Sequence, residues 1–519
     1  MVLSVKVRKN TYYDSVTLML ISKEVKKLEG VKEVLVGMGT DLNKELAQNL
    51  GLANEEVNQL GANDFFISVL SDSDDVINDL VKKVDELLNQ KKDADGDDYI
   101  PPTFDSAVKF APDSNFVIIS LPGQYAFDEV KKALNNNMHV LLFSDNVKIE
   151  EEKELKELAR NKGLLMMGPD CGTAIINNVP LAFANVVEKG NIGIVAASGT
   201  GSQEVSVMID KLGAGVSQLI GTGGRDLSKD IGGIMMTEGI KALAQDPNTK
   251  VIVLISKPPA PEIAEKVLAV AKETGKPFVV NFIGGRPEVI KQYGGIPGVN
   301  LEDTAYKAVA ISRGETVAEG AVYGADEAKL KDIAAKAVQK LQKGQRYLRG
   351  VYTGGTLCDE AMKLLANEIG GIYSNIPLEP QYKLTNVFTS KEHTCVDLGD
   401  DEFTVGRAHP MIDPTMRQER LVKEADDEEV AVILMDFVLG YGANSDPAGE
   451  MVPYIIKAQE KMKAKGKEVI FVGSVCGTEK DPQNLREQEE KLRQVGVIIM
   501  PSNAQAVKLT AELLKAVSQ

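Results

Sequence analysis

The stretch from residue 191 to residue 204 reads NIGIVAASGTGSQE, and it determines how the rest of the chain is interpreted. Its apolar part, 192–197, predicts a buried strand, and the turn 198–201 predicts the start of a helix. The first N–H groups of a helix have no partners within it, and the helix dipole favours anions. Ser198, Gly199, Thr200 and Gly201 are therefore predicted to bind phosphate or carboxylate. The alternative is that Ser198 and Thr200 only cap the helix.

A second apolar run, 251–255, ends in Ser256-Lys257-Pro258-Pro259. Ligands of open α/β sheets bind beyond the carboxyl ends of the strands, so Lys257 is predicted to lie at the ligand edge. The strand 216–221 leads into the glycine-rich loop 221–226. Glycine permits close backbone approach and arginine pairs with anions, so Gly224 and Arg225 are further predicted ligands. The alternative is a surface arginine beside Asp226.

Composition narrows the class of protein. The 519 residues predict three or four domains. Lys+Arg 59 against Asp+Glu 75 gives a net charge of −16, which argues against nucleic-acid and anionic-membrane partners. The N-terminus alternates like a strand, and no apolar run approaches the ~20 residues that span a bilayer, so we expect a soluble, cytoplasmic protein without a signal peptide.

The cysteines carry little functional signal. They lie far apart, without metal spacing or a disulfide pattern, so no metal is predicted. Cys171 could be a nucleophile, but no histidine neighbours it in the sequence. A buried structural thiol is the favoured interpretation. The four positions are Cys171, Cys358, Cys395 and Cys476.

Strand and helix patterns predict an α/β protein of several domains with parallel sheets. A small α+β domain of ferredoxin-like character comes first, before a Pro- and Asp-rich linker at 91–103. A short Rossmann-like run of parallel strand–helix units and a large α/β domain follow. The predicted parts are 1–95, 105–188, 189–320, a connector helix in 321–347, and 348–519.

Residues 348–519 repeat the pattern of the preceding α/β domain. The strand 349–352 leads into Thr353-Gly354-Gly355-Thr356, which opens a helix as residues 198–201 do. Two such domains can face each other around one anion. Gly354, Gly355 and Thr356 therefore join the predicted phosphate- and substrate-binding residues.

Residues 191–313 resemble the flavodoxin-like ligase domain of the succinyl-CoA synthetase α subunit, and 348–519 resemble the C-terminal ligase domain of its β subunit. Residues 105–185 resemble the second half of the CoA-binding domain, through the turn Gly168-Pro169-Asp170-Cys171-Gly172. In that family, two facing helix starts hold a phosphorylated histidine. The turns at 198–200 and 354–356 match those helix starts.

Three departures from that family concern its chemistry. The histidine loop corresponds to 292–296, which reads QYGGI and contains no histidine. The supporting glutamate corresponds to Lys257, which would then face an acyl phosphate or phosphate directly. The CoA-binding glycine loop and an ATP-grasp domain are missing, so CoA is a doubtful ligand and no cofactor is required by the sequence.

Taken whole, the chain resembles the FdrA family, through the strings at 168–173, 223–227, 352–357 and 406–414. That resemblance implies a subunit of an oxamate carbamoyltransferase in allantoin catabolism, which converts oxalurate and phosphate to oxamate and carbamoyl phosphate. It implies partner subunits and an oligomer. Lys257 would neutralise charge, Arg407 would pair with the oxalurate carboxylate, and His409 would donate a proton, although a structural role for His409 is the alternative.

Two other functions stay open at this point. The first is an acyl-CoA synthetase that uses acyl-phosphate chemistry, which requires CoA binding. The second is a non-catalytic subunit that binds a metabolite and docks partner subunits. The missing histidine and the N-terminal domain favour this second possibility.

Overall fold

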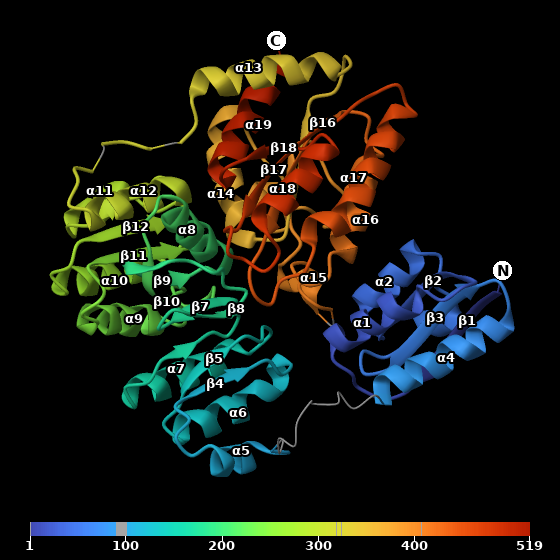
Figure 1. Cartoon of the computed structure of the whole chain (residues 1–519), viewed down its shortest axis with the longest axis horizontal. Coiled ribbons are helices and arrows are strands. Elements are labelled where there is room, and N and C mark those ends of the chain that lie inside the picture. The colour runs from blue at the N-terminus through green and yellow to red at the C-terminus, as the bar shows by residue number, and fades with distance from the viewer. Residues whose placement is uncertain (1, 90–100, 318, 323, 406, 519) are drawn as a thin grey trace. The chain divides into compact units, whose positions relative to one another are not determined.

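A computed structural model describes residues 2–89, 101–317, 319–322, 324–405 and 407–518 (Figure 1). Its internal contacts divide the chain into two units. The first comprises Met1–Ala111 and Gly399–Met416, and the second comprises Pro112–Leu398 and Arg417–Gln519. Most of the predicted linker at 91–103, and Gly406 of the string 406–414, lie outside the described residues.

The first unit contains a three-layer α+β domain. Its antiparallel sheet has the order β1-β3-β2. One face packs on α1 and α4 through residues such as Leu18 and Leu80, and the other packs on α2 and α3 through Leu46 and Val57. The elements are β1 (Val2–Arg8), α1 (Ser15–Val25), β2 (Val31–Met38), α2 (Asp41–Asn49), α3 (Glu55–Asn58), β3 (Phe65–Ser71) and α4 (Asp74–Asn89), with α5 (Phe104–Phe110) and α15 (Asp401–Thr404) in the same unit.

The second unit begins with a small parallel sheet of order β4-β5-β6. Its parallel strands and their helices form a Rossmann-like segment, while the predicted bounds of this domain, 105–188, stay a prediction. The elements are β4 (Phe116–Ile119), α6 (Gly123–Asn135), β5 (His139–Leu142), α7 (Ile149–Asn161) and β6 (Met166–Met167).

The next sheet has seven strands in the order β13-β12-β11-β9-β10-β7-β8. Strands β9 to β13 are parallel and follow the flavodoxin-like order 2-1-3-4-5. The elements are β7 (Thr173–Ile176), β8 (Val179–Ala182), β9 (Lys189–Ala197), α8 (Gly199–Lys211), β10 (Val216–Gly221), α9 (Ile234–Gln245), β11 (Val251–Ser256), α10 (Pro261–Glu273), β12 (Phe278–Phe282), α11 (Pro287–Gln292), β13 (Ile296–Pro297) and α12 (Leu301–Ser312).

The last sheet, of order β15-β14-β16-β17-β18, repeats that topology. The repeat predicted from the glycine turns is therefore confirmed. The elements are α13 (Glu327–Ala337), η1 (Val338–Lys340), β14 (Tyr347–Tyr352), α14 (Gly355–Ile369), η2 (Pro380–Tyr382), β15 (Thr394–Asp397), α16 (Thr415–Glu424), β16 (Val430–Val438), α17 (Pro447–Lys463), β17 (Ile470–Cys476), α18 (Leu485–Gln494), β18 (Ile498–Met500) and α19 (Asn503–Ser518).

The hairpin β7–β8 was not foreseen in the sequence. It follows the Rossmann-like segment, but it pairs with β10 through Ile175 and Leu219 and so extends the flavodoxin-like sheet. Polar turn residues, Asn177 and Asn178, adopt positive φ between its strands. Among the described residues, no helix is both long enough and apolar enough to cross a membrane.

A buried charge network joins the Rossmann-like segment to the flavodoxin-like sheet. Lys156 Nζ lies 2.8 Å from Glu152 Oε1, 2.8 Å from Asp226 Oδ1 and 2.9 Å from the Thr222 carbonyl. Although burial lowers the pKa of Lys156, the two carboxylates outweigh it and the pKa is raised. Asp226 also accepts the Met235 and Met236 N–H groups at the start of α9.

Removing this buried cation should destabilise the protein strongly. Lys156→Ala leaves Asp226 buried without its cation and leaves Glu152 with Arg225 alone, which should cost roughly 3–5 kcal/mol of unfolding free energy. Urea unfolding measures the loss, with Lys153→Ala, an exposed position of the same helix, as the matched control. A loss below about 1 kcal/mol would contradict the importance of the network.

Candidate functional site

The starts of helices α8 and α14 meet through two buried hydroxyl groups. Ser198 caps α8, since its Oγ accepts the Gly201 N–H at 3.1 Å. The same Oγ lies 2.7 Å from Thr356 Oγ1. Ser198 is 4% exposed and Thr356 1% exposed. The capping role considered for Ser198 is therefore real, and it coexists with a contact between the two domains.

Glycine makes this contact possible. A Cβ atom on Gly354 would lie 2.8 Å from the side chain of Thr200, and one on Gly201 would lie 2.8 Å from Thr356 Cγ2. Real Cβ atoms do not approach other atoms so closely, so larger residues would force the helix starts apart. The structure brings together Ser198–Gly201 and Gly354–Thr356 as the sequence predicted.

A lysine and an aspartate converge on the start of α14. A Cβ atom on Gly355 would lie 3.0 Å from Lys257 Nζ and 2.4 Å from Asp397 Oδ2. Lys257 follows β11 and Asp397 ends β15, so both come from carboxyl ends of strands, one in each flavodoxin-like domain. Asp397 is 2% exposed. The sequence identified Lys257 but assigned no role to Asp397.

A second buried carboxylate, that of Asp436, binds the backbone of the turn at Gly354. Asp436, on β16, accepts the N–H groups of Thr353 at 2.9 Å and Gly354 at 2.8 Å. Arg417 donates to Asp436 at 3.0 Å. The Gly354 N–H was expected to bind the external anion, and that expectation is wrong because Asp436 already accepts it. Gly355 and Thr356 are the residues of this turn that Asp436 does not engage.

Arg225 extends the charge network described above toward the surface, with its side chain 41% exposed, and Gly224 precedes it in the same loop. Arg225 donates to Glu152 Oε2 at 3.0 Å and to the Val147 carbonyl at 2.7 Å. A Cβ atom on Gly224 would lie 3.3 Å from Asp170 Oδ2. The described contacts of this loop thus hold the Rossmann-like segment, and a role for Gly224 and Arg225 in anion binding stays a prediction. The sequence identified Arg225 as a candidate site residue, but it did not predict that Arg225 pairs with Glu152.

Arg407 and His409 belong to the segment 399–416, which groups with the N-terminal unit. Arg407 lies 3.5 Å from Asp413, and its buried Nη1 forms no hydrogen bond with the described residues. His409 Nδ1 accepts the Met411 N–H at 3.2 Å. That bond gives His409 the structural role considered as the alternative, and its proton transfer stays a prediction.

The other histidines and Cys171 serve structural purposes. His139 accepts the Leu165 N–H and His393 accepts the Leu348 N–H, and burial lowers the pKa of both imidazoles. Burial raises the pKa of Cys171 to about 12, which keeps the thiol protonated and unreactive. This agrees with a buried structural thiol.

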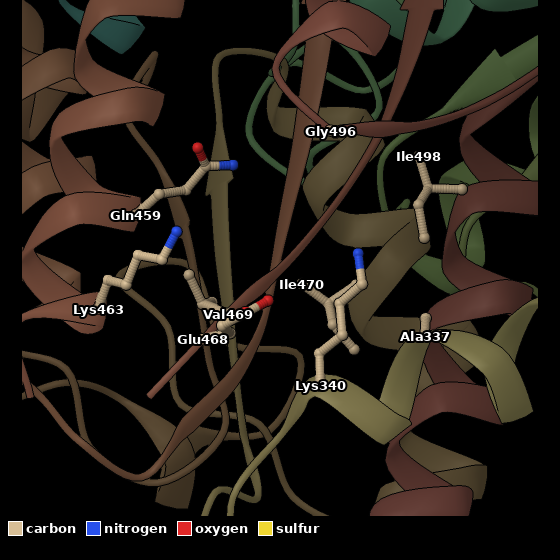
Figure 2. Close-up of a pocket in the computed structure, with 9 residues that line it drawn as sticks. All are labelled: Ala337, Lys340, Gln459, Lys463, Glu468, Val469, Ile470, Gly496 and Ile498. Carbon is tan, nitrogen blue, oxygen red and sulfur yellow. The ribbon is translucent and has the colours of Figure 1, made fainter. Parts of the chain in front are cut away.

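Two pockets of about 240 Å³ flank the strand ends of the flavodoxin-like domains. One lies at the carboxyl ends of β11 and β12 and is lined by Pro258, Pro259, Ile283 and Arg286, directly after Lys257 in the chain. The other lies at the amino ends of β17 and β18, with Lys340 and Lys463 among its lining residues (Figure 2). Only the first is on the ligand edge of its sheet.

Buried glutamates lie where α8, α12, α14 and α19 pack together. Glu360 accepts the Leu301 N–H at 2.7 Å and the Asn503 amide at 2.7 Å. Glu204 accepts the Asn503 N–H at 2.9 Å. Burial raises the pKa of Glu360 from 4.5 to about 7, and the charges of Glu204 and Glu302 add to that increase.

Glu360 should make stability fall as pH rises. Between pH 4.5 and 7 the unfolded chain releases this proton while the folded chain retains it, so folding becomes less favourable, by an amount on the order of 3 kcal/mol once the pH exceeds 7. Glu360→Gln should remove this component. Unfolding free energies at pH 5 and pH 8 measure it, with the exposed Glu368→Gln as control; equal slopes in wild type and Glu360→Gln would refute it.

Sequence comparison identifies the family. The protein YahF of Escherichia coli K12, described as uncharacterized, is 45% identical over 514 residues, which cover 99% of both chains. The chain belongs to the YahF family. A sequence model of the CoA-ligase family matches residues 351–513, one for a CoA-binding domain matches 187–284, and one for the heavy metal-associated domain of AllF matches 1–100.

About a third of this chain also matches subunits of known CoA ligases. The succinate–CoA ligase α subunit 2 of Archaeoglobus fulgidus is 27% identical over 193 residues, 36% of this chain and 64% of that subunit. The sulfoacetate–CoA ligase subunit SqwL of an Acholeplasma species is 28% identical over 179 residues, 33% of this chain and 58% of that subunit. These matches confirm the resemblance to succinyl-CoA synthetase, while membership of the FdrA family stays a prediction. The CoA-binding match falls on the first flavodoxin-like domain, not on 105–188.

Proposed function

We propose that the chain binds an acyl phosphate at the junction of α8 and α14 and transfers its acyl group in a reaction of the CoA-ligase type. The observation that carries this proposal is the direct contact of two helix starts beside Lys257. Helix N-termini favour anions through their dipoles and exposed N–H groups, and two of them with an ammonium group offer a strong seat for a phosphoryl group.

The chemistry follows from that seat. In the transfer, the thiol sulfur of CoA attacks the acyl carbon, the bond between that carbon and the phosphate oxygen breaks, and phosphate leaves with the proton that the thiol loses. The N–H groups at Gly199, Thr200, Gly355 and Thr356, with Lys257, would stabilise the charge that develops on the leaving phosphate. The matches to succinate–CoA and sulfoacetate–CoA ligase subunits support CoA as the acyl acceptor.

A second reaction fits the same seat. The loop at 292–296 contains no histidine, so a phosphohistidine cannot form there. Phosphorolysis of oxalurate needs none: a phosphate oxygen attacks the carbamoyl carbon, the carbon–nitrogen bond breaks, and oxamate leaves with a proton. The AllF match over residues 1–100 supports a link to allantoin catabolism, where the resemblance to the FdrA family places this reaction. The roles that the resemblance implies for Arg407 and His409, which belong to the first unit, stay predictions.

Partner subunits are part of both proposals. The chain shows no ATP-grasp pattern, so a nucleotide-dependent ligase would need a second subunit to form the acyl phosphate. The carbamoyl transfer would likewise take place in a complex. We propose that the active protein is an oligomer containing such subunits.

Two assays separate the reactions. The first incubates the chain with CoA and acetyl or succinyl phosphate and measures thioester; the second supplies oxalurate and phosphate and measures carbamoyl phosphate, each with and without the products of neighbouring genes. Thioester formation that depends on Lys257 supports the ligase-type reaction. Formation of carbamoyl phosphate without thioester supports the second reaction. If neither product forms in any combination of proteins, both proposed reactions are refuted.

Phosphate binding tests the seat itself. Lys257→Gln should weaken the binding of inorganic phosphate about tenfold or more, because it removes the cation beside the helix starts. Asp397→Asn should strengthen binding, because it removes a like charge near the anion. Isothermal titration calorimetry measures both, with Lys250→Gln, an exposed position just before β11, as control. Unchanged affinity in Lys257→Gln would exclude this seat.

A further inference from the structure

The N-terminal domain matches a heavy metal-associated domain, yet its residues do not suit a heavy metal ion. Soft metal ions are bound by thiolate, thioether and imidazole groups. Residues 1–100 contain no cysteine and no histidine. Of the methionines after Met1, Met38 is 3% exposed within the core of the sheet, and Met19 lies alone on α1. The donor set of a soft-metal site is therefore missing.

A carboxylate instead holds together the loops at one end of the sheet. Asp64 Oδ1 accepts the Asn10 N–H at 3.0 Å, and Oδ2 accepts the Gly61 N–H at 2.9 Å. The Asp64 carbonyl accepts the Gly39 N–H at 2.6 Å. The loops after β1 and β2 and before β3 are thus bound to one residue, which is 8% exposed.

The surroundings of Asp64 favour its charged form. The hydrogen bonds from Gly61 and Asn10 lower its pKa, and the charges of Lys9 and Lys44 lower it further. Asn10 adopts a positive φ of 52°, which turns its N–H toward the carboxylate. A Cβ atom on Gly39 would lie 2.4 Å from the Gly61 carbonyl, so the loops are also packed tightly against each other.

We propose that residues 2–89 form a metal-free variant of the heavy metal-associated domain, in which the Asp64 carboxylate fixes the loops at this end of the sheet. The domain then contributes a rigid folded module without taking up zinc, cadmium or copper(I). This inference does not depend on the proposed function.

Hydrogen–deuterium exchange of the full chain, followed by mass spectrometry, tests both parts. Asp64→Ala should speed exchange at the Asn10 and Gly61 amides about tenfold, because their only described acceptor is removed. Asp64→Asn, which keeps one acceptor, should have a smaller effect, and Asp41→Asn, an exposed position at the start of α2, should have none. Continued protection of β3 would show that the domain is still folded.

Metal is then added to the wild-type chain. Zinc(II), cadmium(II) and copper(I) should leave exchange within residues 2–89 unchanged. Protection of any segment within residues 2–89 by one of these ions would overturn the metal-free assignment, and unchanged exchange in Asp64→Ala would overturn the role of Asp64. Peptide-level readout separates these effects from binding to the four cysteines, all of which lie beyond residue 100.

Discussion

The contact between Ser198 and Thr356 is the constraint on which the second unit depends. Two parallel sheets of the same order can be placed side by side in many ways, but a buried hydroxyl pair must remain hydrogen-bonded, and this excludes arrangements that separate the two helix starts. The glycines at 201 and 354 allow the approach. As a result, two helix dipoles point at one region, which neither domain could produce alone.

Charge at this region is balanced by residues from distant parts of the sequence. Lys257 brings a cation from the first domain, while Asp397 and Asp436 bring carboxylates from the second. Asp436 accepts hydrogen bonds from the Thr353 and Gly354 N–H groups in the turn before α14, and Arg417 donates to Asp436 in turn. At the N-terminus of α14, where the helix dipole is positive, Gly355 and Thr356 are not bonded to Asp436 and lie next to Lys257.

Local patterns in the sequence predicted most of the fold. The apolar run at 251–255 became a strand as expected, because buried parallel strands need continuous apolar stretches. The glycine turns located the two helix starts for the same local reason. Asp436 and the partnership of Arg225 with Glu152 could not be foreseen, since they depend on residues 73 or more positions apart that only the tertiary fold brings together.

The β7–β8 hairpin bears on how the molecule can be divided. It is continuous in sequence with the Rossmann-like segment but forms the edge of the flavodoxin-like sheet next to β10. A fragment that starts at residue 189 would expose the backbone groups of β10 as a new sheet edge, a template for aggregation. The two segments are therefore one structural block: recombination or truncation at the apparent domain boundary would break a sheet, whereas a cut before residue 112 would not.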